Sequence, residues 1–203
     1  MTKIVDTLTH YEMLIDENND PVHDNEILRS YMTNWDGPIF YKALDLDSDK
    51  NVLEIGIGTG RVAKSVLEAG CKKFVGIDIS PKTIQRAKEN LKNYKNVDLL
   101  EMNILDFNKS KEPFDIVYSV LTFMHIDDKE KACKNIKELL KDNGYFVLSV
   151  SRDGEWLDYD QRRVRLFPNE VQYYIDLLRK IGFHIDMVKQ TESNCATIIK
   201  ARK

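Results

Sequence analysis

The sequence is poor in cysteine. Its three cysteines, Cys71, Cys133 and Cys195, lie far apart and form no C-x-x-C pair. Disulfide frameworks and structural zinc sites both depend on paired or closely spaced cysteines. We therefore expect buried free thiols and no metal site. With nine glycines and five prolines, the chain also lacks the composition of a low-complexity or fibrous protein.

The chain has no long apolar run and no block of basic residues. No segment approaches the ~18–20 consecutive apolar residues that span a bilayer. Near the start, Asp6 stands where a signal peptide would build its apolar core. Thirty basic residues against thirty-three acidic ones give a net charge of −3, so a phosphate backbone is not the expected partner. These absences predict a cytoplasmic protein that binds neither membranes nor nucleic acid.

The chain does contain enough apolar material for one large core. Of its 203 residues, 42% are hydrophobic and 31% are charged. From residue 51 onward, short apolar runs alternate with stretches of helical period, the pattern of a doubly wound parallel α/β sheet. The expected strands cover residues 51–57, 73–79, 97–104, 114–120 and 145–150. The expected helices run over residues 61–69, 81–91, 128–142 and 169–180.

The two ends of the chain differ from this pattern. Residues 1–50 interleave aromatic and acidic side chains, and we expect two or three short helices that cap one end of a domain formed by residues 51–203. After residue 150 comes an irregular connection of roughly fifteen residues, a length that is often functional. The last apolar runs, residues 183–190 and 195–201, predict an antiparallel hairpin at one edge of the sheet.

A glycine loop joins the first strand to the first helix. Gly56, Gly58 and Gly60 allow a tight turn and a close approach of a ligand, while free N–H groups at the helix start favour an anionic or dipolar group. Asp78 follows eighteen residues after Gly60, at the end of the second strand. A carboxylate in that position can accept both hydroxyl protons of a ribose. The segment predicts a nucleoside-binding site.

A nicotinamide dinucleotide is one candidate ligand. Counted from Gly58, the loop fits G-x-G-x-x-A with an acid twenty residues on. Three features favour another ligand. Counted from Gly56, Arg61 stands where the dinucleotide fold has Gly or Ala; no Tyr-x-x-x-Lys pair is present; and about fifty residues precede the first strand.

Four motifs in order resemble those of class I S-adenosylmethionine-dependent methyltransferases, of the small single-domain kind that acts on small molecules. They are residues 52–60, residues 76–80, residues 114–117 followed by His125 and Ile126, and residues 140–144. The resemblance implies a Rossmann-like sheet of seven strands with the last strand antiparallel. It also implies that S-adenosylmethionine lies across the carboxyl ends of the first strands.

The resemblance also implies which residues hold the cofactor. The glycines would line the methionine part, Asp78 the ribose and Ile79 one face of the adenine. At Asn103 the family commonly has Asp, so an amide oxygen would have to contact the adenine amino group. The expected cofactor-binding residues are Tyr11, Tyr31, Trp35, Glu54, Gly56, Gly58, Gly60, Arg61, Asp78, Ile79, Asn103, Ile104, Leu105, Ser119, Val120 and Leu121.

Methyl transfer depends mainly on alignment, which supplies effective molarities of ~10⁵ M or more, so a general base is optional. His125, just beyond the fourth strand, is the best candidate base if its pKa is near the ordinary value of about 6.5. The alternative is that it only packs under the following helix. Tyr31 is a second catalytic candidate, because Tyr11, Tyr31 and Trp35 either close over the site or staple the N-terminal segment to the sheet.

The connection after the fifth strand, from Arg152 onward, carries a basic cluster of Arg162, Arg163 and Arg165. In the methyltransferase family that this sequence resembles, the corresponding connection commonly borders the substrate pocket. The cluster therefore favours an anionic small molecule, such as a carboxylate, as the acceptor, and the alternative is a solvated loop. The competing functions are an NAD-type oxidoreductase and a protein that binds S-adenosylmethionine without catalysis.

Overall fold

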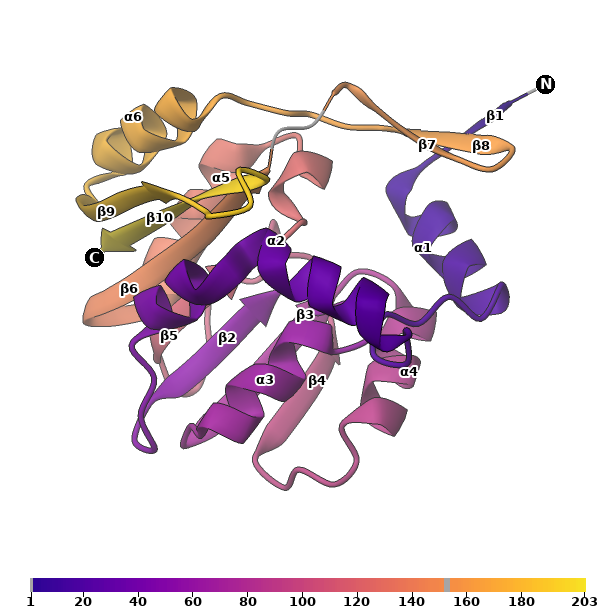
Figure 1. Cartoon of the computed structure of the whole chain (residues 1–203). Helices are drawn as coiled ribbons and strands as arrows, with labels where there is room; N and C mark the ends of the chain where they lie inside the picture. The colour runs from indigo at the N-terminus through magenta and orange to yellow at the C-terminus, as the bar shows by residue number, and fades with distance from the viewer. Residues whose placement is uncertain (1, 152–153) are drawn as a thin grey trace.

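A seven-stranded sheet runs through the centre of the computed structural model, which describes residues 2–151 and 154–203 (Figure 1). Its strand order is β4-β3-β2-β5-β6-β10-β9. The pairs from β4 to β6 are parallel, and β10 runs antiparallel to both β6 and β9. The predicted Rossmann-like sheet with an antiparallel last strand is confirmed. The strands are β2 (Asn51–Ile55), β3 (Lys73–Asp78), β4 (Val97–Glu101), β5 (Phe114–Ser119), β6 (Leu140–Ser151), β9 (His184–Gln190) and β10 (Ala196–Arg202).

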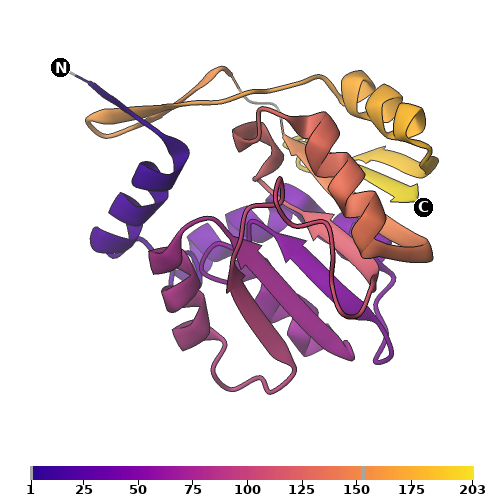
Figure 2. The same cartoon turned by 180° about the vertical axis from the view of Figure 1, so that it is seen from behind.

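Helices cover both faces of this sheet (Figures 1 and 2). One face packs against the second half of α2 and against α3 and α4, in a core that includes Phe40, Val66 and Ile84. The other face packs against α5 and α6, around Ile136 and Leu178. Apolar residues at helical spacing explain these contacts. The helices are α2 (Glu26–Leu44), α3 (Arg61–Ala69), α4 (Pro81–Asn90), α5 (Lys129–Leu139) and α6 (Val171–Ile181).

The N-terminal segment is helical, as expected. Asp6 caps α1 (Thr7–Asp16) by accepting the Thr9 N–H at 2.7 Å. The longer α2 breaks at Gly37, where φ is +68° and Pro38 follows, so it consists of two short helices. None of the described helices combines the length and the apolar character needed to cross a bilayer.

A small second sheet replaces the expected irregular connection. In it, β8 (Arg162–Arg165) pairs antiparallel with β7 (Trp156–Tyr159) and parallel with β1 (Lys3–Val5). Figures 1 and 2 show this sheet projecting beyond the main sheet, with α1 attached to it. Strands of three and four residues carry little periodicity, and the partner β1 comes from the other end of the chain. Sequence patterns could not predict that pairing.

Two other sequence expectations are corrected. The helix predicted to reach residue 142 ends at Leu139, because Leu140 is already extended (φ −79°, ψ 144°) and pairs with Phe114. The third strand ends at Glu101 rather than at residue 104. Arg152 and Asp153, at the start of the connection between β6 and α6, lie outside the described residues.

Candidate active site

A cavity of about 450 Å³ opens at the carboxyl ends of β2, β3 and β5. Open α/β sheets bind ligands at this edge, where the strand order reverses, and small-molecule sites typically measure ~300–1,000 Å³. The glycine loop, the neighbouring strand ends and the N-terminal segment all contribute to its walls. Its lining includes Tyr11, Glu54, Gly56, Gly58, Arg61, Asp78, Ile79, Asn103, Ile104, Leu105, Val120, Leu121 and His125.

The glycine loop is bent by residues with positive φ. Gly56 (φ +73°) donates its N–H to the Ile77 carbonyl oxygen at 2.9 Å, which ties the loop to β3. A Cβ at Gly56 would lie 2.1 Å from Thr122 Oγ1, so the loop passes directly against the segment after β5. At Gly58 (φ +57°) no atom lies within 4 Å of the Cβ position. The loop therefore combines a tight contact with open space at a residue that lines the cavity.

The Asp78 carboxylate is fixed by two backbone donors. Its Oδ2 accepts the N–H of Gly58 and its Oδ1 accepts the N–H of Ser80, both at 3.0 Å. Burial raises the pKa of this carboxyl above its usual value, and the backbone hydrogen bonds from Ser80 and Gly58 oppose the rise. A carboxylate can accept about four hydrogen bonds. Asp78 can thus bind two neighbouring hydroxyl groups of a ligand while it keeps its backbone partners.

Next to the loop, the buried Glu54 is held beside an ion pair. Burial raises the Glu54 pKa to about 8, although Tyr118 donates a hydrogen bond to its Oε2 at 2.9 Å. Arg61 forms an ion pair with Asp36 at 3.3 Å, and Ser149 Oγ donates to the other Asp36 oxygen at 3.0 Å. The charge of Arg61 is compensated by Asp36, and Glu54 is mostly protonated at neutral pH.

Beyond Asp78 the wall is largely apolar and includes Ile79, Met102, Ile104 and Leu105. Asn103 also lines the cavity, but its Oδ1 accepts the Leu105 N–H at 2.9 Å, as in an Asx-turn. The oxygen that we expected to face an adenine amino group is therefore already committed to the turn. Only its second lone pair remains for a ligand.

On the opposite side of the cavity, His125 meets Tyr11. The residue ends a short 3-10 helix (Phe123–His125), and its Nε2 lies 2.9 Å from the Tyr11 hydroxyl. The Nδ1 atom is buried and has no hydrogen-bond partner among the described residues. Burial, followed by the charge of His10, lowers the His125 pKa to about 4. The His125 pKa thus lies below the ordinary histidine value of about 6.5, and the imidazole is neutral at physiological pH.

Four residues expected at the cofactor lie outside the cavity lining. The Tyr31 side chain is exposed and packs edge-on against Trp35, with 6.0 Å between ring centroids. Ser119 is buried beneath the site, where its Oγ donates to the Ile55 carbonyl oxygen at 3.1 Å. Gly60 faces Leu91, which lies 3.1 Å from its Cβ position. The structure thus brings Tyr11 and the catalytic candidate His125 to the cavity, but not Tyr31, the second catalytic candidate.

The basic cluster lies outside the cavity lining. Arg162 is buried against α1, where it binds Glu17 and His10. Arg163 pairs with Asp158 at 3.1 Å, and Arg165 lies over the ring of Phe167. Because none of these three guanidinium groups lines the cavity, and Arg162 and Arg163 are paired with carboxylates, the structure does not place the cluster at an acceptor.

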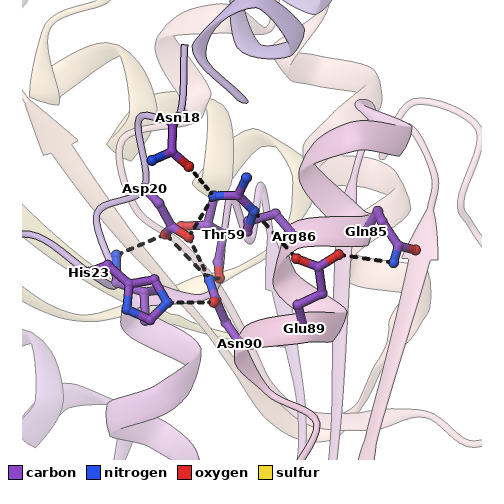
Figure 3. Close-up of polar contacts among 9 residues, drawn as sticks. Asn18, Asp20, His23, Thr59, Gln85, Arg86, Glu89 and Asn90 are labelled. Atoms are coloured by element: carbon purple, nitrogen blue, oxygen red, sulfur yellow. Dashed lines mark hydrogen bonds and ion pairs between the residues drawn. The ribbon is translucent and has the colours of Figure 1, made fainter. Parts of the chain in front are cut away.

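The chain between α1 and α2 is anchored beside the glycine loop (Figure 3). The buried Asp20 carboxylate accepts hydrogen bonds from Arg86 at 3.2 Å and from Asn90 at 3.1 Å. Asn90 Nδ2 also donates to the Thr59 carbonyl oxygen at 3.0 Å, within the loop itself. Burial raises the Asp20 pKa, but hydrogen bonds from Asn90, Arg86 and other nearby groups outweigh that effect. They hold the Asp20 pKa below its usual value.

Sequence reasoning missed some lining residues: Thr7, Pro21, Met32, Thr122 and Asp127. Thr122 and Asp127 flank residues that the motifs did select, so a wider window after β5 would have found them. The three N-terminal residues give no local signal, because only the packing of α1 and α2 over the sheet brings them to the cavity.

The chain resembles known methyltransferases in sequence. The family model that matches residues 46–194 is described as a methyltransferase domain. An uncharacterized methyltransferase of Oceanobacillus iheyensis is 32% identical over 139 residues, which cover 68% of this chain and 58% of that protein. A ribosomal protein L11 methyltransferase of Clostridium perfringens is 29% identical over 138 residues, covering 57% of this chain and 44% of that protein. The chain spans about half the length of the curated relatives it matches.

The fold is also found among solved structures. The N-methyltransferase NodS of Bradyrhizobium japonicum, in complex with S-adenosyl-L-homocysteine, aligns with a TM-score of 0.71 and 20% identity over 95% of this chain and 97% of that one. At that identity the likeness shows the fold, whereas the family model covers well over half of the sequence. The chain therefore belongs to this methyltransferase-domain family, which confirms its resemblance to the class I S-adenosylmethionine-dependent methyltransferases.

Proposed function

We propose that this chain transfers the methyl group of S-adenosylmethionine to a small-molecule acceptor that binds beneath α1. The observation that carries the proposal is the cover over the cavity. Thr7, Tyr11 and Pro21 line the same volume of about 450 Å³ as the glycine loop. Cofactor and acceptor group would share this volume, which favours a small acceptor over a bulky macromolecular one.

The residues on the sheet side fit the cofactor. Asp78 has acceptor capacity left for the two ribose hydroxyls, and the open space at Gly58 leaves room for the methionine part. The apolar wall around Ile79 and Leu105 suits an adenine ring. These features fit the adenosine of either cofactor, and the family of the chain favours S-adenosylmethionine over a nicotinamide dinucleotide.

When bound, S-adenosylmethionine supplies a methyl group on a positively charged sulfur, and its transfer to an acceptor atom leaves S-adenosylhomocysteine. The protein contributes mainly alignment, worth effective molarities of ~10⁵ M or more. Leu121, held at φ +52°, lines the cavity, and Thr122 packs against Gly56 of the loop, near where the two ligands would meet. His125 lines this cavity with its Nε2 beside the Tyr11 hydroxyl, so the two side chains would form the wall against which the acceptor group lies.

His125 would orient the acceptor and would not act as a general base. With a pKa of about 4, its imidazole is neutral over the physiological range. An acceptor that is already neutral and nucleophilic needs no stronger base. His125 and Tyr11 therefore belong to the acceptor wall of the cavity, and the arginine cluster, which lies outside its lining, gives no reason to expect an anionic acceptor.

The acceptor class can be tested before the acceptor itself is identified. The full chain is incubated with methyl-tritiated S-adenosylmethionine and a cell extract, which is then separated by ultrafiltration into low-mass and macromolecular fractions. We expect a labelled low-mass product that chromatography separates from the unreacted cofactor, and none of this product with the Asp78→Ala variant. Label confined to protein or RNA would contradict the small-molecule proposal.

Two further outcomes decide between the alternatives. Calorimetric binding of S-adenosylhomocysteine without a labelled product in either fraction would favour a cofactor-binding protein without catalysis. Binding of NADH with no binding of S-adenosylhomocysteine would favour an oxidoreductase and overturn the proposal. The relatives of this chain include a ribosomal-protein methyltransferase and an N-methyltransferase, so their names do not fix its acceptor.

A further inference from the structure

A single arginine on β8 holds the helix that covers the cavity. Arg162 Nε donates to His10 Nδ1 at 3.0 Å, and its two terminal nitrogens bind the two oxygens of Glu17, one of them at 2.8 Å. The guanidinium also lies 4.7 Å from the centre of the Tyr159 ring. The Arg162 side chain is 5% exposed. All of its polar contacts are therefore directed to α1 and the residue that follows it, in the bidentate geometry that only arginine offers.

These contacts fix how α1 is rotated about its own axis. His10 and Glu17 are seven positions apart, which places them on the same face of a helix. Tyr11 follows His10 and lies about 100° further around the helix. With His10 and Glu17 clamped to Arg162, the Tyr11 ring is aimed at the cavity, where its hydroxyl meets His125 Nε2 at 2.9 Å.

The backbone supports the same arrangement. Arg162 pairs with Lys3 in the parallel β1–β8 ladder, and β1 leads through the Asp6 cap directly into α1. Arg162 therefore sets both the starting point of the helix, through its main chain, and the rotation of the helix, through its side chain. The neighbouring Arg163 pairs with Asp158 of β7.

We propose that Arg162 is a positioning residue for the acceptor wall: it orients α1 so that the Tyr11 hydroxyl reaches His125 at the cavity. Its functional meaning rests on the proposed methyl transfer, in which Tyr11 and His125 face the acceptor. The geometric claim concerns the protein alone. The acceptor wall then forms only when two segments far apart in the sequence, β1–α1 and β7–β8, are packed together.

The test observes His125 directly. NMR of the full chain with isotope-labelled histidine reports the two ring nitrogens of His125, assigned with a His125→Asn variant. We expect Arg162→Lys to shift both resonances toward the values found in Tyr11→Phe, because lysine keeps the charge but cannot make the three directed hydrogen bonds. The matched control is Arg163→Lys, on the same strand, which we expect to leave both resonances at their wild-type positions.

A second variant covers the case in which Arg162→Lys does not fold. Glu17→Gln changes a half-exposed side chain at the end of α1, weakens the same clamp and should produce the same shifts. Wild-type resonances of His125 in a folded Glu17→Gln or Arg162→Lys protein would overturn the proposal. Binding of S-adenosylhomocysteine should stay within about a factor of two of wild type in both variants.

These readouts separate the two proposals. The His125 resonances are recorded without any ligand, so they judge the positioning role even if the chain transfers no methyl group. Failure of the wild-type chain to bind S-adenosylhomocysteine would count against the proposed function only.

Discussion

The two sides of the cavity are built in different ways. The cofactor side comes from consecutive elements, β2 to β4, and the Asp78 carboxylate at the end of β3 holds the glycine loop by accepting the Gly58 N–H. The acceptor side joins Tyr11 to His125, 114 positions away, and depends on Arg162, 152 positions from His10. The first side is encoded by local sequence, whereas the second exists only when distant segments pack together.

The two sides also differ in the direction of their pKa shifts, although burial is the main cause of the shift on both sides. On the cofactor side it raises the Glu54 pKa to about 8, and on the acceptor side it lowers the His125 pKa to about 4. Both shifts favour the neutral form. The cavity therefore keeps a buried acid and a buried base that are both uncharged near neutral pH.

The largest effect is expected on the cofactor side, at the contact between the loop and Thr122. Gly56→Ala places a Cβ 2.1 Å from Thr122 Oγ1 at a φ of +73°. Overpacking and the positive φ together should cost about 2–5 kcal/mol of stability. Urea unfolding measures this loss. Gly58→Ala has positive φ but open space and should lose only about 1–2 kcal/mol; equal losses would contradict the steric account.

The next largest effect is expected when the Asp78 carboxylate, the charged hydrogen-bond acceptor on the cofactor side, is neutralised. Asp78→Asn should weaken binding of S-adenosylhomocysteine about ten- to a hundredfold, because charge-assisted hydrogen bonds are lost. Isothermal titration calorimetry measures the Kd. The matched control is Asp98→Asn, at the exposed carboxylate that pairs with Lys73 at 3.1 Å. An unchanged Kd in Asp78→Asn would show that the ribose is held elsewhere.

The buried acid and base predict opposite effects of pH on stability. Above pH 6.5 the native state keeps a proton on Glu54 that the unfolded chain has released, so stability should fall by about 2 kcal/mol by pH 8. His125 acts in the other direction, because below pH 6.5 only the unfolded chain protonates it, until the pH reaches about 4. Between the ordinary pKa of glutamate, 4.5, and that of histidine, 6.5, the two effects should nearly cancel.

Urea unfolding across this pH range measures the combined effect. Glu54→Gln should remove the decline above pH 6.5, while the matched control Glu192→Gln, at an exposed glutamate, should keep it. A decline that persists in Glu54→Gln would mean that another group carries it.

The smallest effect is expected on the acceptor side. Tyr11→Phe removes one hydrogen bond to His125 and should lower methyl transfer by about two- to tenfold, since such a bond contributes ~0.5–1.5 kcal/mol. Formation of the tritiated low-mass product, separated from the unreacted cofactor by chromatography, measures the rate. Tyr173→Phe, on the exposed side of α6, is the control. A parallel loss of S-adenosylhomocysteine affinity in Tyr11→Phe would mean that Tyr11 belongs to the cofactor side.

The motifs predicted the sheet, the glycine loop and Asp78 because each depends on neighbours close in sequence. They did not separate Gly56 and Gly58, which line the cavity, from Gly60, which packs against Leu91. Nor did they distinguish Tyr11 from Tyr31, because both are tyrosines in an aromatic segment. The direction of a side chain on a helix that packs over a sheet depends on contacts that the local pattern does not contain.

The arginine cluster gives the clearest contrast. From the sequence alone, Arg162, Arg163 and Arg165 formed a cluster of charges without assigned partners. In the structure Arg162 binds Glu17 and His10, and Arg163 forms an ion pair with Asp158. A charge count does not reveal which charges are paired, because buried charges find their partners only through folding.

The sequence by itself determined the doubly wound sheet, the family and the cofactor loop, since hydrophobic period and glycine positions act over a few residues. Only the tertiary structure decided which aromatic residue reaches the cavity, that His125 is neutral, and that Arg162 holds α1. Burial, long-range pairing and helix orientation are properties of the packed chain. They come from contacts between segments that lie more than a hundred positions apart.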